Sequence, residues 1–331
     1  MSAGAVKRLV TAAFSLLAVA AVIAVLMLAR AHWAELSAWR PTAAQLGMAA
    51  AAAAAYALLL ALLAEGWHGL LRATAGPGIR RARSHPSFML TQVGKYLPGN
   101  VFHLVGRHVW LARGALAHTL LLRCLLAETV AIAGAAGVVG LAMLPWLYGD
   151  AGPWAAIRPV VLLAAAAMIA AIAAVLRHGA GGARMAAQGA GDARMAAQGA
   201  GGGRMPAGTA LWVGARTLAL SIAFFAGQAG LFLALCLVVS GQADAGLVAI
   251  ATVAWLVGFV TPGAPAGAGV RDLLLVVLAA PVTGEAEAII ATAAYRLVTV
   301  AGDGLLFAMG AGVVLASGRS LRPAPEPPAA G

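Results

Sequence analysis

Two short stretches of the chain share one pattern and lie in different halves of it. Residues 94–107 read GKYLPGNVFHLVGR, and residues 258–272 read GFVTPGAPAGAGVRD. In each stretch a Pro-Gly pair interrupts an apolar run, and an Arg follows the Pro nine residues later, at Arg107 and Arg271. Such Gly- and Pro-broken segments in corresponding positions of two halves are typical of a transport site between two repeats. The pattern therefore predicts one binding site formed by both stretches.

The composition places this pattern in a membrane. The 331 residues are 62% hydrophobic and only 10% charged, whereas soluble domains carry about 25% charged residues. We expect an all-α polytopic membrane protein with about eight transmembrane elements in two pseudo-repeats. The uninterrupted apolar runs that predict spans are 9–29, 43–64, 117–144, 159–176, 209–239, 245–261 and 288–316.

Two further apolar segments, residues 86–106 and 263–282, contain the breaks. Each could be a re-entrant hairpin, a pair of half-helices or a short span. Residues 270–282 would cover about 20 Å as a helix, which is less than the hydrocarbon core of about 30 Å. Broken backbone at membrane depth is tolerated only where protein or water surrounds it. Either segment should therefore line a cavity if it enters the bilayer.

Arginine and lysine in the loops predict the orientation. They cluster before the first span, after the second, after the fourth and after the last, which places both termini in the cytoplasm. Residues 270–282 must then cross as a short, tilted or distorted eighth element. The alternative is seven spans and an outside C-terminus, which Arg319 and Arg322 disfavour. We expect one transmembrane domain over residues 1–318, with a low-complexity cytoplasmic loop at 177–208 and a disordered cytoplasmic tail at 319–331. The formal charge of +11 fits this topology and an anionic lipid surface better than nucleic acid.

Charged side chains inside the spans are the next signal. Each costs about 2.5–3.5 kcal/mol at a helix centre, so it normally faces a partner, a cavity or a pathway. Arg123 and Glu128 are about 140° apart around a helix, so we do not expect them to pair. Arg123 and Arg216 lie near span ends, where snorkelling is the simpler interpretation. Arg296 and Asp303 share a helix face and could pair through a bridging group.

Arg271 and Asp272 follow a Gly/Pro-rich break. A helix beginning near Val270 would direct its positive end and the Arg271 guanidinium at one point, which suits an anion. We expect no metal site, cofactor or catalytic motif, because the two cysteines lie in apolar runs and no metal-ligand or nucleophile motif is present. The predicted substrate-binding residues are Lys95, Pro98, Gly99, Asn100, Arg107, Pro262, Gly263, Gly267, Gly269, Arg271, Asp272, Arg296 and Asp303.

At these residues the chain resembles a known family. KYLPGN at 95–100 with Gly106-Arg107, and PG at 262–263 through GVRD at 269–272 with Tyr295-Arg296, are similar to motifs of the flippase-like transmembrane domain of lysylphosphatidylglycerol synthase. The resemblance implies a polytopic helical domain of the bacterial inner membrane that moves lipids between leaflets. Asp272 stands where that family usually has Glu, and Ala264-Pro265 replaces a simpler glycine run. No aminoacyl-transfer domain is present, so synthase activity is not implied.

Three functions remain open. The first is a non-enzymatic flippase or scramblase for an anionic or phosphate-bearing lipid, such as a phospholipid or a polyprenyl-phosphate-linked sugar, working beside a separate transferase. Arg107, Arg271 and Arg296 would bind the headgroup, and Asp272 and Asp303 would hold those arginines or couple to protons. The second is a polyprenyl-phosphate-dependent glycosyltransferase, which needs acidic groups in outer loops, where no paired cluster is evident. The third is a small-anion transporter.

Overall fold

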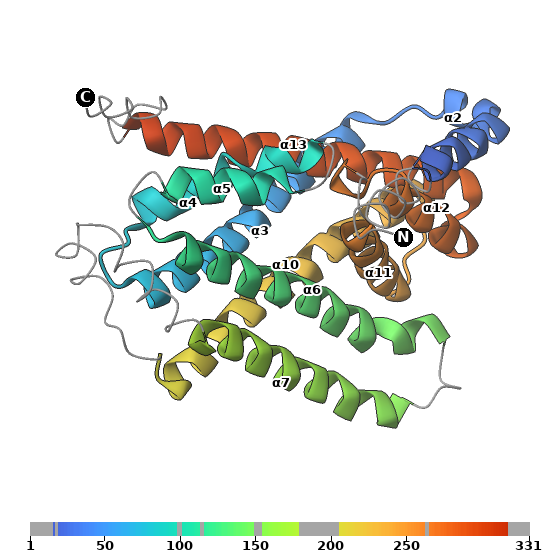
Figure 1. The fold of residues 1–331 in the computed structure, drawn as a ribbon. Helices are drawn as coiled ribbons and strands as arrows, with labels where there is room; N and C mark the ends of the chain where they lie inside the picture. Colours follow the sequence, from blue (N-terminus) through green and yellow to red (C-terminus); the bar gives the residue numbers. More distant parts are fainter. Residues whose placement is uncertain are drawn as a thin grey trace, which may run out of the picture.

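The protein is a bundle of helices running in both directions. The computed structural model describes Leu16 and residues 19–97, 101–112, 116–148, 154–178, 205–261 and 265–316. Over these ranges every regular element is helical, and none is a strand. Figure 1 shows the long helices lying side by side across the molecule.

Five helices in the described ranges are long and apolar enough to cross a membrane. They are α3 (Ala43–Ala75), α6 (His118–Tyr148), α7 (Trp154–His178), α10 (Ala207–Ser240) and α13 (Glu285–Ala316). The apolar helices indicate a membrane-embedded protein, as the composition predicts. A further apolar helix, Val19–Ala31, lies within the first predicted span. It precedes the short α2 (Trp33–Ala38).

Local sequence sets the ends of these helices. Thr42 and Gln45 form a capping box at the start of α3, in which each side chain accepts a hydrogen bond from the other residue's backbone N–H. Glycines with positive φ follow three helices: Gly76 after α3, Gly241 after α10 and Gly284 after α12 (Val270–Thr283). Only glycine adopts this conformation without strain, so these positions stop one helix and redirect the chain.

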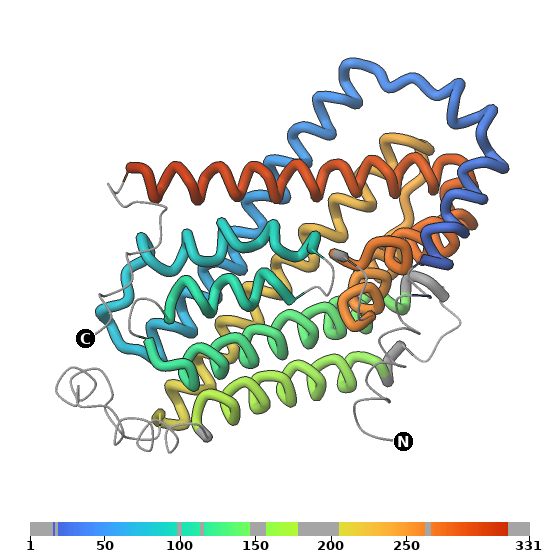
Figure 2. The backbone as a smooth tube through the Cα atoms, turned by 45° about the horizontal axis from the view of Figure 1, so that its top comes forward, coloured from blue at the N-terminus to red at the C-terminus, as the bar shows by residue number. Residues whose placement is uncertain are grey.

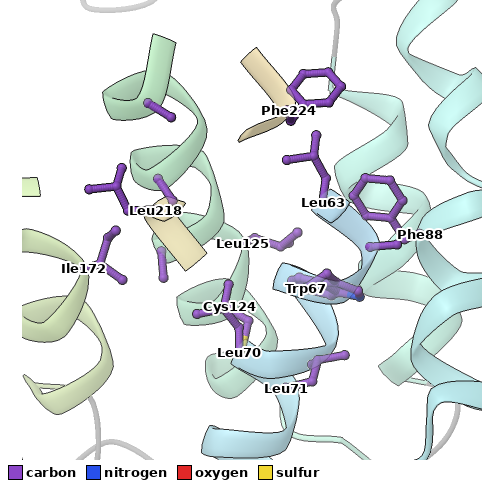
Figure 3. Packing of buried hydrophobic residues seen from close by; sticks show 14 of the residues in the cluster. Leu63, Trp67, Leu70, Leu71, Phe88, Cys124, Leu125, Ile172, Leu218 and Phe224 are labelled. Carbon is purple, nitrogen blue, oxygen red and sulfur yellow. The ribbon is translucent and has the colours of Figure 1, made fainter. Parts of the chain in front are cut away.

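A core of large apolar side chains joins α3, α6, α7 and α10 (Figure 3). Trp67 and Leu70 of α3 are fully buried, as are Ile172 of α7 and Phe225 of α10. The outward faces are also apolar, because Leu162, Leu163 and Leu297 are 71%, 69% and 72% exposed. Leucines exposed to this degree on long helices fit a lipid solvent, in which burying them gives no gain.

Two helical hairpins complete the molecule. The first hairpin, residues 81–112, consists of α4 (Arg81–Met89), the 3₁₀ helix η1 (Gln92–Tyr96) and α5 (Phe102–Ala112). The second hairpin, residues 246–283, consists of α11 (Gly246–Val260), the 3₁₀ turn η3 (Pro265–Gly267) and α12 (Val270–Thr283). The two arms of each hairpin pack against each other, so the chain doubles back at the broken segment.

The hairpins enter the bundle from opposite ends. The first hairpin begins and ends where α3 ends and α6 begins, on the left in Figures 1 and 2. The second hairpin begins and ends where α10 ends and α13 begins, on the right in the same views. Their tips meet inside the bundle, where η1 contacts η3.

Five predicted spans match α3, α6, α7, α10 and α13 in order and position, although α3 continues to Ala75, eleven residues beyond its predicted end. The predicted span 245–261 is the 15-residue α11, which forms one arm of the second hairpin. The interrupted segments 86–106 and 263–282 correspond to the two hairpins, and α12 covers about 21 Å as a 14-residue helix. Residues 179–204 of the predicted cytoplasmic loop and all of the predicted tail (319–331) lie outside the described residues.

Candidate functional site

A cavity lies where the two hairpin tips meet. Its volume is about 80 Å³, which is room for on the order of five to eight water molecules. Both hairpins and three long helices contribute to its wall, which combines apolar rings with cationic side chains. The lining residues are Tyr56, Leu60, Leu63, Phe88, Gln92, Lys95, His103, Arg107, Ile132, Phe224, Trp255, Phe259, Ala266, Gly267 and Arg271.

The tip of the second hairpin has an unusual backbone. Ala266, Gly267 and Gly269 have φ values of 48°, 71° and 84°, the left-handed region in which non-glycine residues are rare. Gly267 also packs directly on Gly258 of α11, because a Cβ built on Gly258 would lie 3.2 Å from the Gly267 Cα. The turn therefore needs glycines both for its conformation and for this close approach.

This turn sets the start of α12 and the position of Arg271. The backbone N–H of Gly269 donates to Asp272 Oδ2 at 3.2 Å, and α12 begins at the next residue. An acidic side chain in the first turn complements the positive end of a helix. Arg271 follows Val270, and its side chain lies on the cavity wall.

Arg271 is a buried cation with unused hydrogen-bond donors. The residue is 6% exposed, and neither its Nε nor its Nη2 has a hydrogen-bond partner. Its Nε lies 3.9 Å from Asp272 Oδ1, which is too far for a hydrogen bond. The guanidinium carbon lies 5.6 Å from the centre of the Tyr295 ring. Buried donors of this kind are normally satisfied, so the two unpartnered nitrogens of Arg271 are an exception in this structure.

Arg296 and Asp272 complete this side of the cavity. Arg296 Nη1 donates to the backbone oxygen of Ala266 at 3.2 Å and lies 3.8 Å from Asp272 Oδ1. The Asp272 carboxylate is therefore shared between Arg271 and Arg296, and its Oδ1 makes no hydrogen bond. That Asp272 holds these arginines in place stays a prediction.

The tip of the first hairpin is held by Asp303 of α13. Lys95 Nζ donates to Asp303 Oδ1 at 2.9 Å, and the Tyr96 hydroxyl donates to Oδ2 at 2.5 Å. Asp303 is 1% exposed, so this carboxylate is buried with two partners. Asp303 and Arg296 make no direct contact with each other in the structure, because Asp303 binds the tip of the first hairpin and Arg296 binds the tip of the second.

Arg107 also reaches the cavity, and its charge is paired with Glu128, although its buried Nε makes no hydrogen bond. Its Nη1 donates to both oxygens of Glu128 on α6, at 2.7 and 2.5 Å, and its Nη2 donates to Gln92 Oε1 at 3.3 Å. The guanidinium lies 4.1 Å from the centre of the Phe88 ring. Arg107 and Glu128 are 2% and 3% exposed. This pair therefore locks the first hairpin to α6.

The predicted site residues fall into three groups. The structure brings Lys95, Arg107, Gly267 and Arg271 to the cavity wall, with Asp272, Arg296 and Asp303 directly behind it. Gly269 shapes the turn before α12. The predicted residues that lie outside the described ranges are Pro98, Gly99, Asn100, Pro262 and Gly263.

Several site residues were not predicted. Tyr56, Gln92 and Tyr96 line the cavity or hold its charges, and the partner of Glu128 was not foreseen. Glu128 carried a usable signal, because a carboxylate within a span needs a cation. Tyr96 lies beside Lys95 in the broken stretch, whereas Tyr56 is an ordinary residue of an Ala-rich helix and gave no signal.

A second ionic cluster holds the first hairpin outside the cavity. Arg81 donates to both oxygens of Glu65 on α3, at 3.0 and 2.7 Å. Arg216 of α10 donates to Glu65 Oε1 at 3.0 Å, and His85 lies 3.1 Å from Glu65 Oε2. Arg216 therefore forms an ion pair with Glu65 of α3, a partner that the snorkelling interpretation did not include.

At the opposite end of the bundle, His32 connects two acidic residues, although the sequence shows no paired acidic cluster in the outer loops. His32 forms hydrogen bonds with Glu285 at 2.7 Å and with Glu35 at 3.3 Å. The Glu35 and Glu285 side chains are 64% and 66% exposed. This exposed cluster connects the segment before α2 to the start of α13. Among the described residues, no group of three His, Cys, Asp or Glu side chains could hold a metal ion.

No protein-family model and no curated protein sequence matches the chain. The resemblance to the flippase-like domain of lysylphosphatidylglycerol synthase therefore stays a prediction. The function must be argued from the geometry of the cavity.

Proposed function

We propose that the protein is a lipid flippase or scramblase that moves an anionic or phosphate-bearing lipid between leaflets. One observation carries the proposal. Arg271 is buried on the wall of a cavity between two hairpin tips, and two of its nitrogens have no partner. A buried cation with free donors is costly unless a ligand satisfies it. An anionic headgroup would do so.

The chemistry of the cavity suits a phosphate on an apolar tail. A guanidinium presents its donors in a planar fork that matches phosphate oxygens. The cavity has room for a group of phosphate size, and its walls include the rings of Phe224, Trp255 and Phe259. Bound in this way, a headgroup would cross the bundle while its acyl chains stay in the surrounding lipid.

The two hairpins suggest how access alternates. We propose that both are re-entrant, entering the bilayer from opposite sides and meeting near its middle. Withdrawal of the first hairpin would open the cavity to one leaflet, and withdrawal of the second would open it to the other. The contacts that must break are polar. For the first hairpin they include those of Lys95 and Tyr96 with Asp303 and of Arg107 with Glu128, and for the second hairpin they include that of Arg296 with Ala266.

We further propose a bacterial inner-membrane location with both termini in the cytoplasm. The positive charge of the loops supports this orientation. The first hairpin would then enter from the cytoplasmic side and the second from the outside. The protein would not be an enzyme. A separate transferase could modify the lipid before or after it is moved.

The test is lipid exchange in vesicles. The purified protein, reconstituted with labelled anionic phospholipid, should accelerate exchange between leaflets. Arg271→Ala should lower the rate at least about tenfold, because it removes the unpaired cation that the headgroup satisfies. Arg40→Ala is the matched control, since Arg40 is an exposed arginine bonded only to nearby backbone oxygens.

Two results would contradict the proposal. If wild-type protein accelerates exchange and Arg271→Ala does so equally, Arg271 does not bind the headgroup. If the wild type transports soluble anions but leaves lipid exchange unchanged, the protein is a small-anion transporter and not a flippase.

A further inference from the structure

The charges around the cavity do not balance. Within the part of the chain that the structure describes, four cations line the cavity or contact its lining: Lys95, Arg107, Arg271 and Arg296. Three carboxylates face them: Glu128 binds Arg107, Asp303 binds Lys95, and Asp272 lies between Arg271 and Arg296. Two arginines therefore share one carboxylate, and one positive charge is left over.

The wall has one further basic side chain, His103. It is counted as neutral at pH 8, because that pH is well above the usual histidine pKa of about 6.5. The uncompensated charge lies on the second hairpin, where Arg271 has two unpartnered nitrogens and is 6% exposed. The two cavity cations of the first hairpin are already compensated, because Lys95 is paired with Asp303 and Arg107 with Glu128.

We infer that the site binds a phosphate carrying a single negative charge, that is, a phosphate diester and not a phosphate monoester. This inference rests on the proposed function and names its substrate class. A diester brings one charge and neutralises the site. A monoester brings nearly two negative charges at pH 8. Binding it would therefore leave about one uncompensated negative charge in a mostly buried cavity, which is costly.

The sharpest probe is a pair of lipids that differ by one methyl group and one charge. Phosphatidic acid is a phosphate monoester, and phosphatidylmethanol is the diester formed by adding one methyl group to its phosphate. With identical acyl chains, the two are compared at pH 8 by displacement of a labelled lipid from the purified full-length protein in nanodiscs. We expect phosphatidylmethanol to bind at least about tenfold more tightly, because phosphatidic acid leaves an unpaired buried charge.

Charge variants test the reason for this preference. Asp303→Asn raises the surplus to two positive charges and should shift the preference toward phosphatidic acid. The double variant Lys95→Gln with Asp303→Asn removes a cation and a carboxylate together, so the surplus returns to one and the preference for the diester should return. Arg271→Gln removes the surplus and should weaken both lipids. Arg40→Gln, the control, should leave the binding of both lipids unchanged.

Binding and transport are measured in parallel, so that a failure of the diester inference can be distinguished from a failure of the flippase proposal. Equal or tighter binding of phosphatidic acid by the wild type at pH 8 would overturn the single-charge inference, whatever the transport rate. Diester selectivity without lipid exchange would support the inference and contradict the flippase. Diethyl phosphate, a soluble diester, identifies the source of the ligand: it should compete only weakly if a lipid is bound, and strong competition would identify a soluble ligand.

Discussion

At the residue scale, the pairing of Arg107 with Glu128 is a test of how buried charges are held. Both side chains are almost fully buried and bonded through two short contacts. Removing one partner leaves a buried charge without compensation, which typically costs about 3–5 kcal/mol. We therefore expect Glu128→Gln to lower the free energy of unfolding by that amount, as measured by denaturant titration in detergent.

The double variant Arg107→Met with Glu128→Leu is the control for this prediction. Replacing both charges by apolar side chains of similar size removes the desolvation cost, so most of the stability should return. If Glu128→Gln unfolds at the same denaturant concentration as the wild type, the ion pair contributes nothing. The carboxyl group would then be neutral or bonded to water.

His32 gives a second residue-scale prediction, outside the spans. Desolvation lowers the pKa of His32, but its hydrogen bonds with Glu285 and Glu35 outweigh this effect, so its pKa lies above the usual value of about 6.5. A raised pKa means that the contact stabilises the fold fully below about pH 6.5 and stops doing so as the pH rises through the raised value. The His32 NMR titration should therefore have a midpoint above 6.5.

The matched variant for His32 is Glu285→Gln, which removes the nearer carboxylate and leaves Glu35 in place. Its midpoint should fall toward 6.5, and His32→Gln identifies the signal among the seven histidines. A midpoint at or below 6.5 in the wild type would show that the carboxylates do not hold the imidazolium.

At the element scale, the two hairpins depend on glycines at their closest approaches. A Cβ on Gly94 would lie 2.9 Å from the backbone nitrogen of His103, and one on Gly258 would lie 2.9 Å from the Arg271 Cβ. These neighbours belong to backbone or to the base of a side chain, so they cannot move aside cheaply. We expect Gly94→Ala and Gly258→Ala each to cost about 1–3 kcal/mol, seen as a lower Tm in detergent.

Gly304→Ala is the comparison for the hairpin glycines, because nothing lies within 4 Å of a Cβ at that exposed helix position. It should be neutral or slightly stabilising, since alanine favours helix more than glycine. A Tm for Gly258→Ala as high as that of Gly304→Ala would mean that α11 and α12 do not pack as closely as the structure has them.

The long helices could be predicted from the sequence because each follows an uninterrupted apolar run. The end of α3 could not, since its last two turns carry polar residues but bury Leu70 and Leu71 against neighbouring helices. The broken stretches were found by their Pro-Gly pairs and the arginines that follow. Which carboxylate binds which cation depends on how the tips meet in space: Lys95 and Asp303 are 208 residues apart, and no spacing rule connects them.

At the scale of the whole molecule, the opposed hairpins have a consequence for topology. The loop before the first hairpin and the loop before the second lie at opposite ends of the bundle (Figure 1). If the bundle spans the bilayer, a cysteine at Gly78 should be reached from the cytoplasm, and a cysteine at Ala243 from outside. Both positions are exposed. A membrane-impermeant maleimide applied to intact cells should label Ala243→Cys only, and disruption of the membrane should add Gly78→Cys.

The background of this experiment is low, because Cys124 and Cys236 are fully buried. Labelling of both variants from outside, or of neither, would place the two hairpins on one side of the membrane. The cavity between their tips would then open toward a single leaflet. Alternating access needs one hairpin on each side, so the opposite labelling of these two loops is the condition on which any transport through this cavity depends.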